Sequence, residues 1–320
     1  MRNKCAIVTG ATGFVGWQMI RELVNENYDV YALTGHPESA ELRWAKEVPD
    51  DCVVKPQFVF FHHTAYSETL EYLMKKNIRG REAVFFHFAW EGSAGEKRSD
   101  YEIQLRNVEM ALHCVDMAAD LGCLFVGAGS IMEDDCVSLI CKEAETFPTP
   151  YIYSNAKLMA HYLCKIQAEK RGIPFRWGKI SNAYGEGDRT GRFINSMLKD
   201  FIENNRCKLS ECTQFYDFIY ITDVARAFRY IAEKGRDNAS YYIGSFDIRQ
   251  LKDYVMEMYN IVKSDSELLF GAYPDPIVSF PKEYYNSRPL YEDTGFKSSI
   301  SFKDGINRTL RWMNHGSICI

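Results

Sequence analysis

Short apolar runs alternate with amphipathic stretches along the first half of the chain. The first run begins at Lys4 and ends at three glycines, and residues 17–25 then place apolar side chains at the spacing of one helical face. Further strands are predicted at 28–33, 58–61, 83–88 and 123–126, and helices at 68–76, 100–121 and 151–171. Residues 38–55 have a helical pattern that becomes irregular. In the helix at 100–121, the expected buried stripe is Leu105, Val108, Leu112, Val115 and Ala119.

The glycines that follow the first strand are spaced three apart, as Gly10-x-x-Gly13-x-x-Gly16. In a strand–turn–helix unit, the first glycine permits the turn, the second lets backbone approach a pyrophosphate, and the third lets the helix pack closely on the sheet. The amino terminus of the helix then binds the phosphates. Such a triplet is a weak signal alone, but its place directly after a strand predicts a dinucleotide site.

The residue at the end of the second strand bears on which dinucleotide binds. A carboxylate there accepts a hydrogen bond from the adenosine ribose 2′-hydroxyl of NAD and repels the 2′-phosphate of NADP. Thr34 occupies this position, and His36 and Arg43 follow as possible phosphate partners. No arginine follows the strand directly, so both NAD and NADP stay open.

Candidate catalytic residues follow the later strands. Ser130 comes after the run at 123–126, and the carboxyl ends of parallel strands face the crevice where ligands bind. Tyr153 and Lys157 are four residues apart, so both project from one face of the helix at 151–171. A neighbouring ammonium favours the phenolate and brings a tyrosine closer to the range of a useful base. His87, at the end of an earlier strand, is interpreted as a core histidine.

Composition narrows the class of protein. The chain has 320 residues, of which 46% are hydrophobic and 25% charged, with a formal net charge of -5. This allows a large core and gives no basic surface for nucleic acid. No apolar stretch has membrane-spanning length and no leader precedes the first strand, so a cytoplasmic protein is expected. The ten cysteines and seven histidines lack metal-ligand spacing, which predicts reduced thiols and no metal site.

Taken in order, these motifs resemble the extended short-chain dehydrogenase/reductases, in the NAD-dependent epimerase/dehydratase family that modifies nucleotide sugars. The similarity covers about four-fifths of the chain. It rests on the glycine triplet, His87-Phe88-Ala89, Asn107, Ser130, Tyr153-x-x-x-Lys157, Asn182-Ala183-Tyr184-Gly185, and Asp217-Phe218-Ile219-Tyr220-Ile221-x-Asp223-Val224-Ala225.

The resemblance implies an α/β fold with a Rossmann-type doubly wound parallel sheet and a smaller α+β C-terminal lobe. The cofactor domain would comprise residues 1–180 plus 217–245, and the substrate lobe residues 181–216 plus 246–320. It implies Tyr153 as general acid/base, Lys157 holding the nicotinamide ribose, and Ser130 bonding the reacting oxygen. The residues expected to bind NAD or NADP are Gly10, Thr12, Gly13, Phe14, Val15, Gly16, Thr34, Ala89, Asn107, Lys157 and Ile180. Those expected at the substrate are Trp90, Asn182, Arg192 and Tyr216.

Two departures from the family pattern narrow the function. Members that eliminate water carry an Asp-Glu pair directly after the active-site Ser or Thr, where this chain has Ile131-Met132. A 4,6-dehydratase is therefore disfavoured, although Glu133 and Asp134 lie close by and a shift of one turn could bring one of them into the cleft. Members that clamp a nucleotide diphosphate use an arginine where Tyr216 stands, and a second in a run that is missing here. The substitutes would be Arg192 or Arg288, or both are solvated loop residues.

Three functional hypotheses follow. The first is hydride transfer at a secondary alcohol or ketone of a nucleotide sugar, by a 4-ketoreductase or an epimerase. The second is an NADPH-dependent reductase of a small carbonyl compound without a nucleotide, and the third is a non-catalytic NAD(P)-binding sensor. The resemblance also implies a homodimer in which the helices at 100–121 and 151–171 pair across a two-fold axis. Its candidate contact residues are Met110, Met117, Met159 and Leu163.

Overall fold

The computed structural model describes residues 4–48, 55–141, 148–274 and 279–316, and its centre is a seven-stranded sheet. The strands run in the order β10-β6-β5-β4-β1-β2-β3, and every pairing is parallel. They are β1 Lys4–Thr9, β2 Asp29–Thr34, β3 Gln57–Phe60, β4 Glu82–His87, β5 Leu124–Ser130, β6 Phe175–Ile180 and β10 Ser240–Ile243. The crossover between β1 and β4 places the carboxyl ends of these two strands at a topological switch point. The predicted Rossmann-type fold is confirmed.

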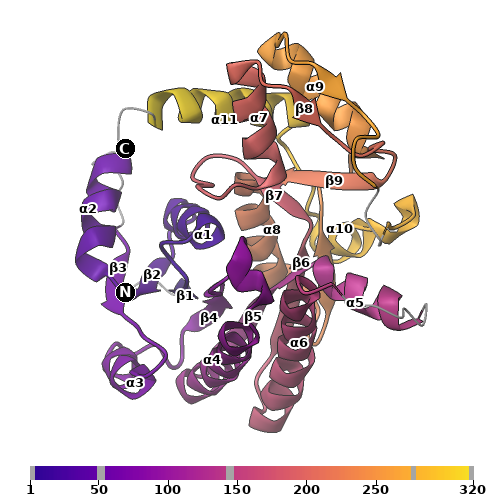
Figure 1. Ribbon diagram of the computed structural model, residues 1–320. Helices are drawn as coiled ribbons and strands as arrows, with labels where there is room; N and C mark the ends of the chain where they lie inside the picture. Colours follow the sequence, from indigo (N-terminus) through magenta and orange to yellow (C-terminus); the bar gives the residue numbers. More distant parts are fainter. Residues whose placement is uncertain (1–3, 49–54, 142–147, 275–278, 317–320) are drawn as a thin grey trace.

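Helices cover both faces of this sheet. One face carries α1 (Phe14–Asn25) and α8 (Ile221–Lys234), and the other carries α3 (Tyr66–Met74), α4 (Tyr101–Leu121) and α6 (Tyr151–Arg171). Figure 1 shows α4 and α6 side by side below the sheet. Because successive side chains of a strand point to opposite faces, Ala6 and Val8 join the core under α1, and Ile7 joins the core under α4. The continuous apolar run of β1 is therefore buried on both sides.

The second half of the chain builds two small sheets and their helices. Strands β7 (Asn182–Tyr184) and β11 (Ile248–Gln250) flank β9 (Phe215–Tyr220), while β8 (Cys207–Lys208) pairs with β12 (Leu268–Leu269). Figure 1 places α7, in red, and α9, in orange, above the main sheet. The remaining elements are α2 Pro37–Glu47, η1 Glu96–Ser99, α5 Met132–Cys141, α7 Phe193–Glu203, α9 Leu251–Val262, η2 Lys282–Tyr284, α10 Arg288–Thr294 and α11 Phe302–Gly316.

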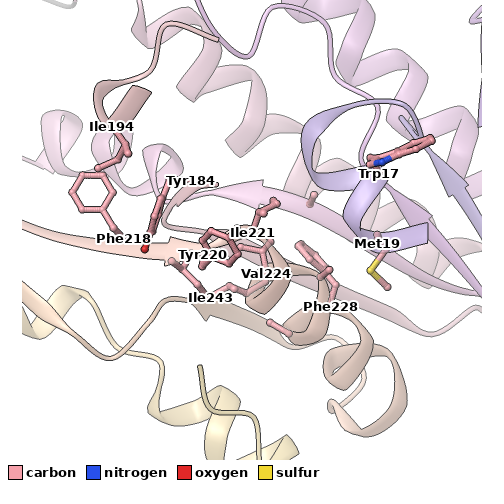
Figure 2. Close-up of a cluster of buried hydrophobic side chains, with 14 of the residues drawn as sticks. Trp17, Met19, Tyr184, Ile194, Phe218, Tyr220, Ile221, Val224, Phe228 and Ile243 are labelled. Carbon is pink, nitrogen blue, oxygen red and sulfur yellow. The ribbon is translucent and has the colours of Figure 1, made fainter. Parts of the chain in front are cut away.

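One hydrophobic cluster joins the small sheet to the main one. It runs from Trp17 on α1 through Phe228 on α8 to Phe218 on β9, as Figure 2 shows. Ile194 on α7 and Ile306 on α11 belong to the same cluster. The two parts of the chain therefore share one continuous apolar core.

Element positions agree closely with the sequence pattern, with two differences. Helix α6 spans the predicted residues, but α5 occupies a stretch that the pattern left as a polar connection. On α4 the predicted stripe is partly wrong, because Leu105 is 50% exposed while Asn107 and Cys114 face the core. The inward face of α4 is set by the loop it packs against, and this loop is held by polar side chains.

Asp223, in the first turn of α8, attaches the C-terminal segment to the sheet. Its carboxylate is 1% exposed and accepts hydrogen bonds from the backbone amides of Ser299 and Ile300, at 2.8 and 2.9 Å. The Ser299 hydroxyl and the Arg226 guanidinium complete its shell. The segment that leads into α11 is therefore held by one buried anion.

Asp223→Asn should destabilise the protein by about 2–4 kcal/mol, because an amide cannot accept from all of these donors. Urea unfolding followed by circular dichroism measures this. Asp237→Asn is the matched control, since Asp237 is 59% exposed and pairs only with Arg176, so its loss should cost about 1 kcal/mol or less. Equal losses in the two variants would contradict the anchoring role of Asp223.

Candidate active site

The loop between β1 and α1 requires glycine at two of its three predicted positions. Gly10 has a φ of 65°, and a Cβ there would lie 2.6 Å from the backbone nitrogen of Ala89. A Cβ on Gly16 would lie 2.1 Å from the carbonyl oxygen of Gly10. Gly10 thus lets β4 approach the loop, and Gly16 lets α1 begin directly against it.

Gly13 and the first turn of α1 fit a pyrophosphate. A Cβ on Gly13 would meet only the carbonyl oxygen of Gly10, at 3.2 Å, so the other side of this residue is open. Gly13 is also the N-cap of α1, and no side chain caps the helix there. The amides of Phe14 and Val15 therefore keep free donors at the positive end of the helix dipole. This arrangement matches the phosphate site that the sequence predicts.

The end of β2 presents polar groups without a carboxylate. Thr34 is buried, its hydroxyl lies 3.4 Å from that of Thr12, and it accepts a hydrogen bond from the amide of His36. Arg43 lies over the ring of Trp17, at 3.8 Å, and donates to the backbone oxygen of Thr12. A cation therefore lies beside the glycine loop, where a 2′-phosphate could be accommodated.

The end of β4 is fixed by Thr9 and Asn107. The hydroxyl of Thr9 lies 2.9 Å from Nδ1 of His87 and accepts from the amide of Ala89. Burial lowers the pKa of His87 to about 3, so its ring is neutral. Asn107 accepts from the amide of Glu91 at 2.9 Å and donates to the same residue's carbonyl at 2.8 Å. Asn107 thus holds the loop after β4, and direct contact with the cofactor stays a prediction.

Ser130, Tyr153 and Lys157 meet at the carboxyl end of β5. Ser130 is the last residue of the strand, while Tyr153 and Lys157 lie on the face of α6 that packs against it. Lys157 is buried, donates to the carbonyl of Ala128 at 2.9 Å, and lies 3.6 Å from the ring centre of Trp90. Trp90 in turn presents its edge to Tyr153. The structure thus brings Trp90 together with the three predicted catalytic residues.

The electrostatics of Tyr153 differ from the sequence prediction. Burial raises the pKa of this phenol, whereas hydrogen bonding with Ser130 and the charges of Arg98 and Arg192 lower it. Burial also lowers the pKa of Lys157 to about 7, with the negative charge of Glu133 opposing this. The ammonium of Lys157, which was expected to lower the pKa of the phenol, is therefore only partly charged at neutral pH. The guanidinium groups of Arg98 and Arg192 lower the pKa of Tyr153 instead.

Glu133 and Asp134 form their hydrogen bonds and ion pairs with groups other than the phenol. Glu133 is buried and accepts from the backbone amide of Ser130 at 2.9 Å, from the indole of Trp177 at 3.1 Å, and lies 2.9 Å from Nδ1 of His161. Asp134 pairs with Lys179 at 2.7 Å. The one-turn shift considered from the sequence therefore does not occur. Glu133 instead fixes the backbone of Ser130 and contributes charge near Lys157.

The other predicted substrate residues, Asn182, Arg192 and Tyr216, come from the small sheet and from α7. Asn182 lies at the start of β7 and donates weakly to the backbone of Asp217, and Arg192 is the N-cap of α7. Tyr216 stacks on Phe218 in β9. Ile180, predicted at the cofactor, pairs in register with Ser130 and accepts a hydrogen bond from Ile131 through its backbone oxygen. Their roles toward ligands stay predictions.

Arg98, His161 and Asp135 were missed by the sequence analysis. His161 follows Lys157 by four residues, so helical spacing could have placed it on the same face. Arg98 gave no signal, because its position depends on how η1 docks beside α6. Asp135 belongs to α5, and burial raises its pKa to about 7 with a contribution from Asp134. Its electrostatic neighbours include Arg98 and Tyr216.

The described residues were also searched for metal sites and membrane spans. Among them, no group of three or more His, Cys, Asp or Glu side chains could hold a metal ion. No helix in the same part of the chain is long and apolar enough to cross a bilayer.

Comparison with known proteins points to one family. The model of the NAD dependent epimerase/dehydratase family matches residues 6–244. CDP-abequose synthase of Salmonella muenchen is 23% identical over 317 residues, which cover 96% of this chain and 97% of that protein. The dTDP-glucose 4,6-dehydratase of Escherichia coli is 24% identical over 341 residues, covering 96% of this chain and 92% of that enzyme.

Solved structures share the fold at similar length. The Bordetella bronchiseptica enzyme WbmF in complex with NAD+ superposes with a TM-score of 0.74 and 19% identity, covering 99% of this chain and 94% of that one. MoeE5 in complex with UDP-glucose and NAD has a TM-score of 0.74 and 18% identity, covering 98% of this chain and 99% of that one.

Gly16→Ala tests the glycine loop. Helix propensity alone would make the variant about 1 kcal/mol more stable, but the Cβ would overlap the carbonyl of Gly10. We expect a loss of at least about 1 kcal/mol and an NAD affinity lower by about 10-fold, measured by thermal unfolding and calorimetry. Gly35→Ala is the control, because its Cβ would meet nothing closer than 3.9 Å. Wild-type NAD affinity in Gly16→Ala would refute the loop as the phosphate site.

Proposed function

The chain belongs to the NAD dependent epimerase/dehydratase family, and we propose that it transfers hydride at a secondary alcohol or ketone carbon of a nucleotide sugar. Within this class, a 4-ketoreductase or an epimerase is favoured. The observation that carries the proposal is the meeting of Ser130, Tyr153 and Lys157 at the same sheet edge as the open glycine loop. The full-length similarity to CDP-abequose synthase supports it.

Each of the three residues has one task in this proposal. When bound, NAD(P) supplies the hydride donor or acceptor. Tyr153 moves a proton between its phenol oxygen and the substrate oxygen, and Ser130 donates a hydrogen bond to that oxygen as charge develops on it. Lys157, already a donor to Ala128, has further protons with which to hold the hydroxyls of the nicotinamide ribose. The ring of Trp90 covers the ammonium of Lys157 and excludes water from it.

The surroundings of Ser130 argue against elimination of water. Ile131 is buried in a small apolar cluster, and Met132 accepts a hydrogen bond from Arg98 through its sulfur. Glu133 and Asp134 are both engaged elsewhere. No acid and base therefore occupy the two positions after Ser130, and hydride transfer with a single acid/base is the simpler chemistry for this site.

We further propose that residues 1–180 plus 217–245 hold the cofactor, and residues 181–216 plus 246–320 the substrate. The α8 helix and β10 of the returning segment pack on the main sheet, which supports this division. Asn182, Arg192 and Tyr216, from the second part, are then the groups nearest the sugar.

Tyr153→Phe should leave NAD binding within about twofold of wild type and lower kcat by roughly 10²- to 10⁴-fold, because it removes only the transferable proton. Calorimetry with NAD and turnover assays with CDP-, UDP- and dTDP-sugars measure the two effects. Retention of full turnover would remove Tyr153 from its proposed role.

The same assays separate the candidate reactions. A reductase consumes one reduced cofactor per product, so absorbance at 340 nm falls, whereas an epimerase shows no net change. Turnover of small ketones but not of nucleotide sugars would favour a carbonyl reductase without a nucleotide substrate. Tight NAD binding with no turnover of either panel would favour a sensor.

We also propose a homodimer through α4 and α6. Large apolar side chains are exposed on the two adjacent helices, which supports a buried partner surface. They are Tyr101, Leu105, Met159, Tyr162, Leu163 and Ile166. Of the residues named from the sequence, Met159 and Leu163 are among them, but Met117 is 3% exposed and belongs to the core under the sheet.

Ile166→Glu should convert the dimer to a monomer at micromolar concentration, because the substitution places a charge at a side chain that is 61% exposed in the monomer. Light scattering coupled to size exclusion measures this. Ile202→Glu on α7 is the control, with a side chain 44% exposed away from this surface, and should leave the mass unchanged. A monomeric wild-type protein would refute the proposed interface.

A further inference from the structure

Arg98 is held beside Tyr153 but lacks the partners that a guanidinium normally has. Its carbon Cζ lies 4.7 Å from the centre of the Tyr153 ring, and its Nη2 donates to the sulfur of Met132 at 3.3 Å. Its Nε is buried without any hydrogen-bond acceptor. A thioether is a weak acceptor, so most of the donor capacity of this group is unused. Five donors on a rigid plane are costly to hold near a protein interior unless an anion meets them.

Arg192 approaches the same phenol from the other part of the chain. It stands at the amino end of α7, where its Nη2 donates to the hydroxyl of Ser93 at 3.4 Å, and its guanidinium lies 6.0 Å from the ring of Phe14. Ser93 belongs to the loop that leads into η1 and Arg98. The charge of Arg192, like that of Arg98, acts on Tyr153. The two guanidinium groups thus flank one phenol, with the β4–η1 loop linking them.

No carboxylate in the described part of the chain forms an ion pair with either guanidinium. The acidic group that acts on Arg98 is Asp135, and the two are not paired. Burial raises the pKa of Asp135 to about 7, so this carboxyl is only partly ionised near neutral pH. Most other arginines in the described residues, by contrast, pair with an acid, for example Arg229 with Glu22. In the described residues, no ion pair therefore neutralises the two guanidinium groups beside Tyr153.

We propose that Arg98 and Arg192 together bind an anionic oxygen group of the substrate. The group is a carboxylate on the transformed sugar or a phosphate of the nucleotide diphosphate, because guanidinium planes match both geometries. The inference rests on the proposed function, since it places the substrate at Tyr153. It adds Arg98, from the cofactor half of the chain, to the substrate-binding residues.

Binding to the NAD-loaded protein tests the proposal. The probes are UDP, CDP and dTDP, their neutral hexose conjugates, and UDP-glucuronic acid, each titrated by calorimetry into wild type, Arg98→Gln and Arg192→Gln. Loss of a charged hydrogen-bonding partner should weaken binding by about 10- to 100-fold. Arg98→Lys, which keeps the charge but loses the planar fork, should give an intermediate loss. Unchanged NAD affinity and thermal unfolding in each variant show that the fold is intact.

The pattern of losses identifies the anion. A loss for UDP-glucuronic acid that UDP-glucose does not share assigns the site to a sugar carboxylate, and equal losses for all nucleotides, free diphosphates included, assign it to the phosphates. Arg206→Gln is the matched control, because Arg206 is exposed and already paired with Glu267, and it should change no affinity. Binding that neither Arg98→Gln nor Arg192→Gln weakens beyond this control overturns the inference. If no probe binds wild type while NAD does, the proposed function itself fails.

Discussion

The contact between α6 and the carboxyl end of β5 is the constraint on which the rest of the site depends. This packing buries Lys157. Its ammonium donates a hydrogen bond to the carbonyl of Ala128 and lies over the face of the Trp90 ring. Removing a charge from water is costly, so the pKa of Lys157 falls to about 7. The energy that would keep this lysine charged at neutral pH has to come from groups around it, above all from Glu133 and from a bound cofactor.

Two glycines in β5 make room for Glu133, whose negative charge favours the charged form of Lys157. A Cβ on Gly127 would lie 2.1 Å from the ring of Trp177, and one on Gly129 would lie 2.2 Å from Oε1 of Glu133. Because both positions lack a side chain, the indole of Trp177 and the carboxylate of Glu133 can lie flat against the strand. His161 then closes the network through Glu133 and the hydroxyl of Ser240, 2.7 Å from its other nitrogen. The strand that ends in Ser130 therefore leaves room for a buried anion beside its carboxyl end.

The sequence predicted the strands, the helices and the fold better than it predicted the charged groups around Tyr153. The glycine triplet, the buried strands and the helix at 151–171 are local patterns, so they predicted the sheet and the family correctly. The predicted burial of Leu105 was wrong, because the inward face of α4 includes two polar residues, Gln104 and Asn107, which bond the loop after β4. Likewise, spacing alone placed Lys157 beside Tyr153 but could not show that desolvation would reduce its charge. The position of Arg98 could not be predicted from the sequence, since its approach to the phenol depends on how the short 3₁₀ helix η1 packs against α6.

The distribution of charge around Tyr153 has a consequence for the order of events at this site. While Arg98 and Arg192 are uncompensated, they favour the phenolate, which is the form that accepts a proton from an alcohol. An anion bound between them would cancel much of this effect, and the pKa of Tyr153 would rise toward the value that burial alone imposes. The protonated phenol is the form that a ketone substrate needs. An anionic ketone would therefore raise the pKa of its own proton donor on binding.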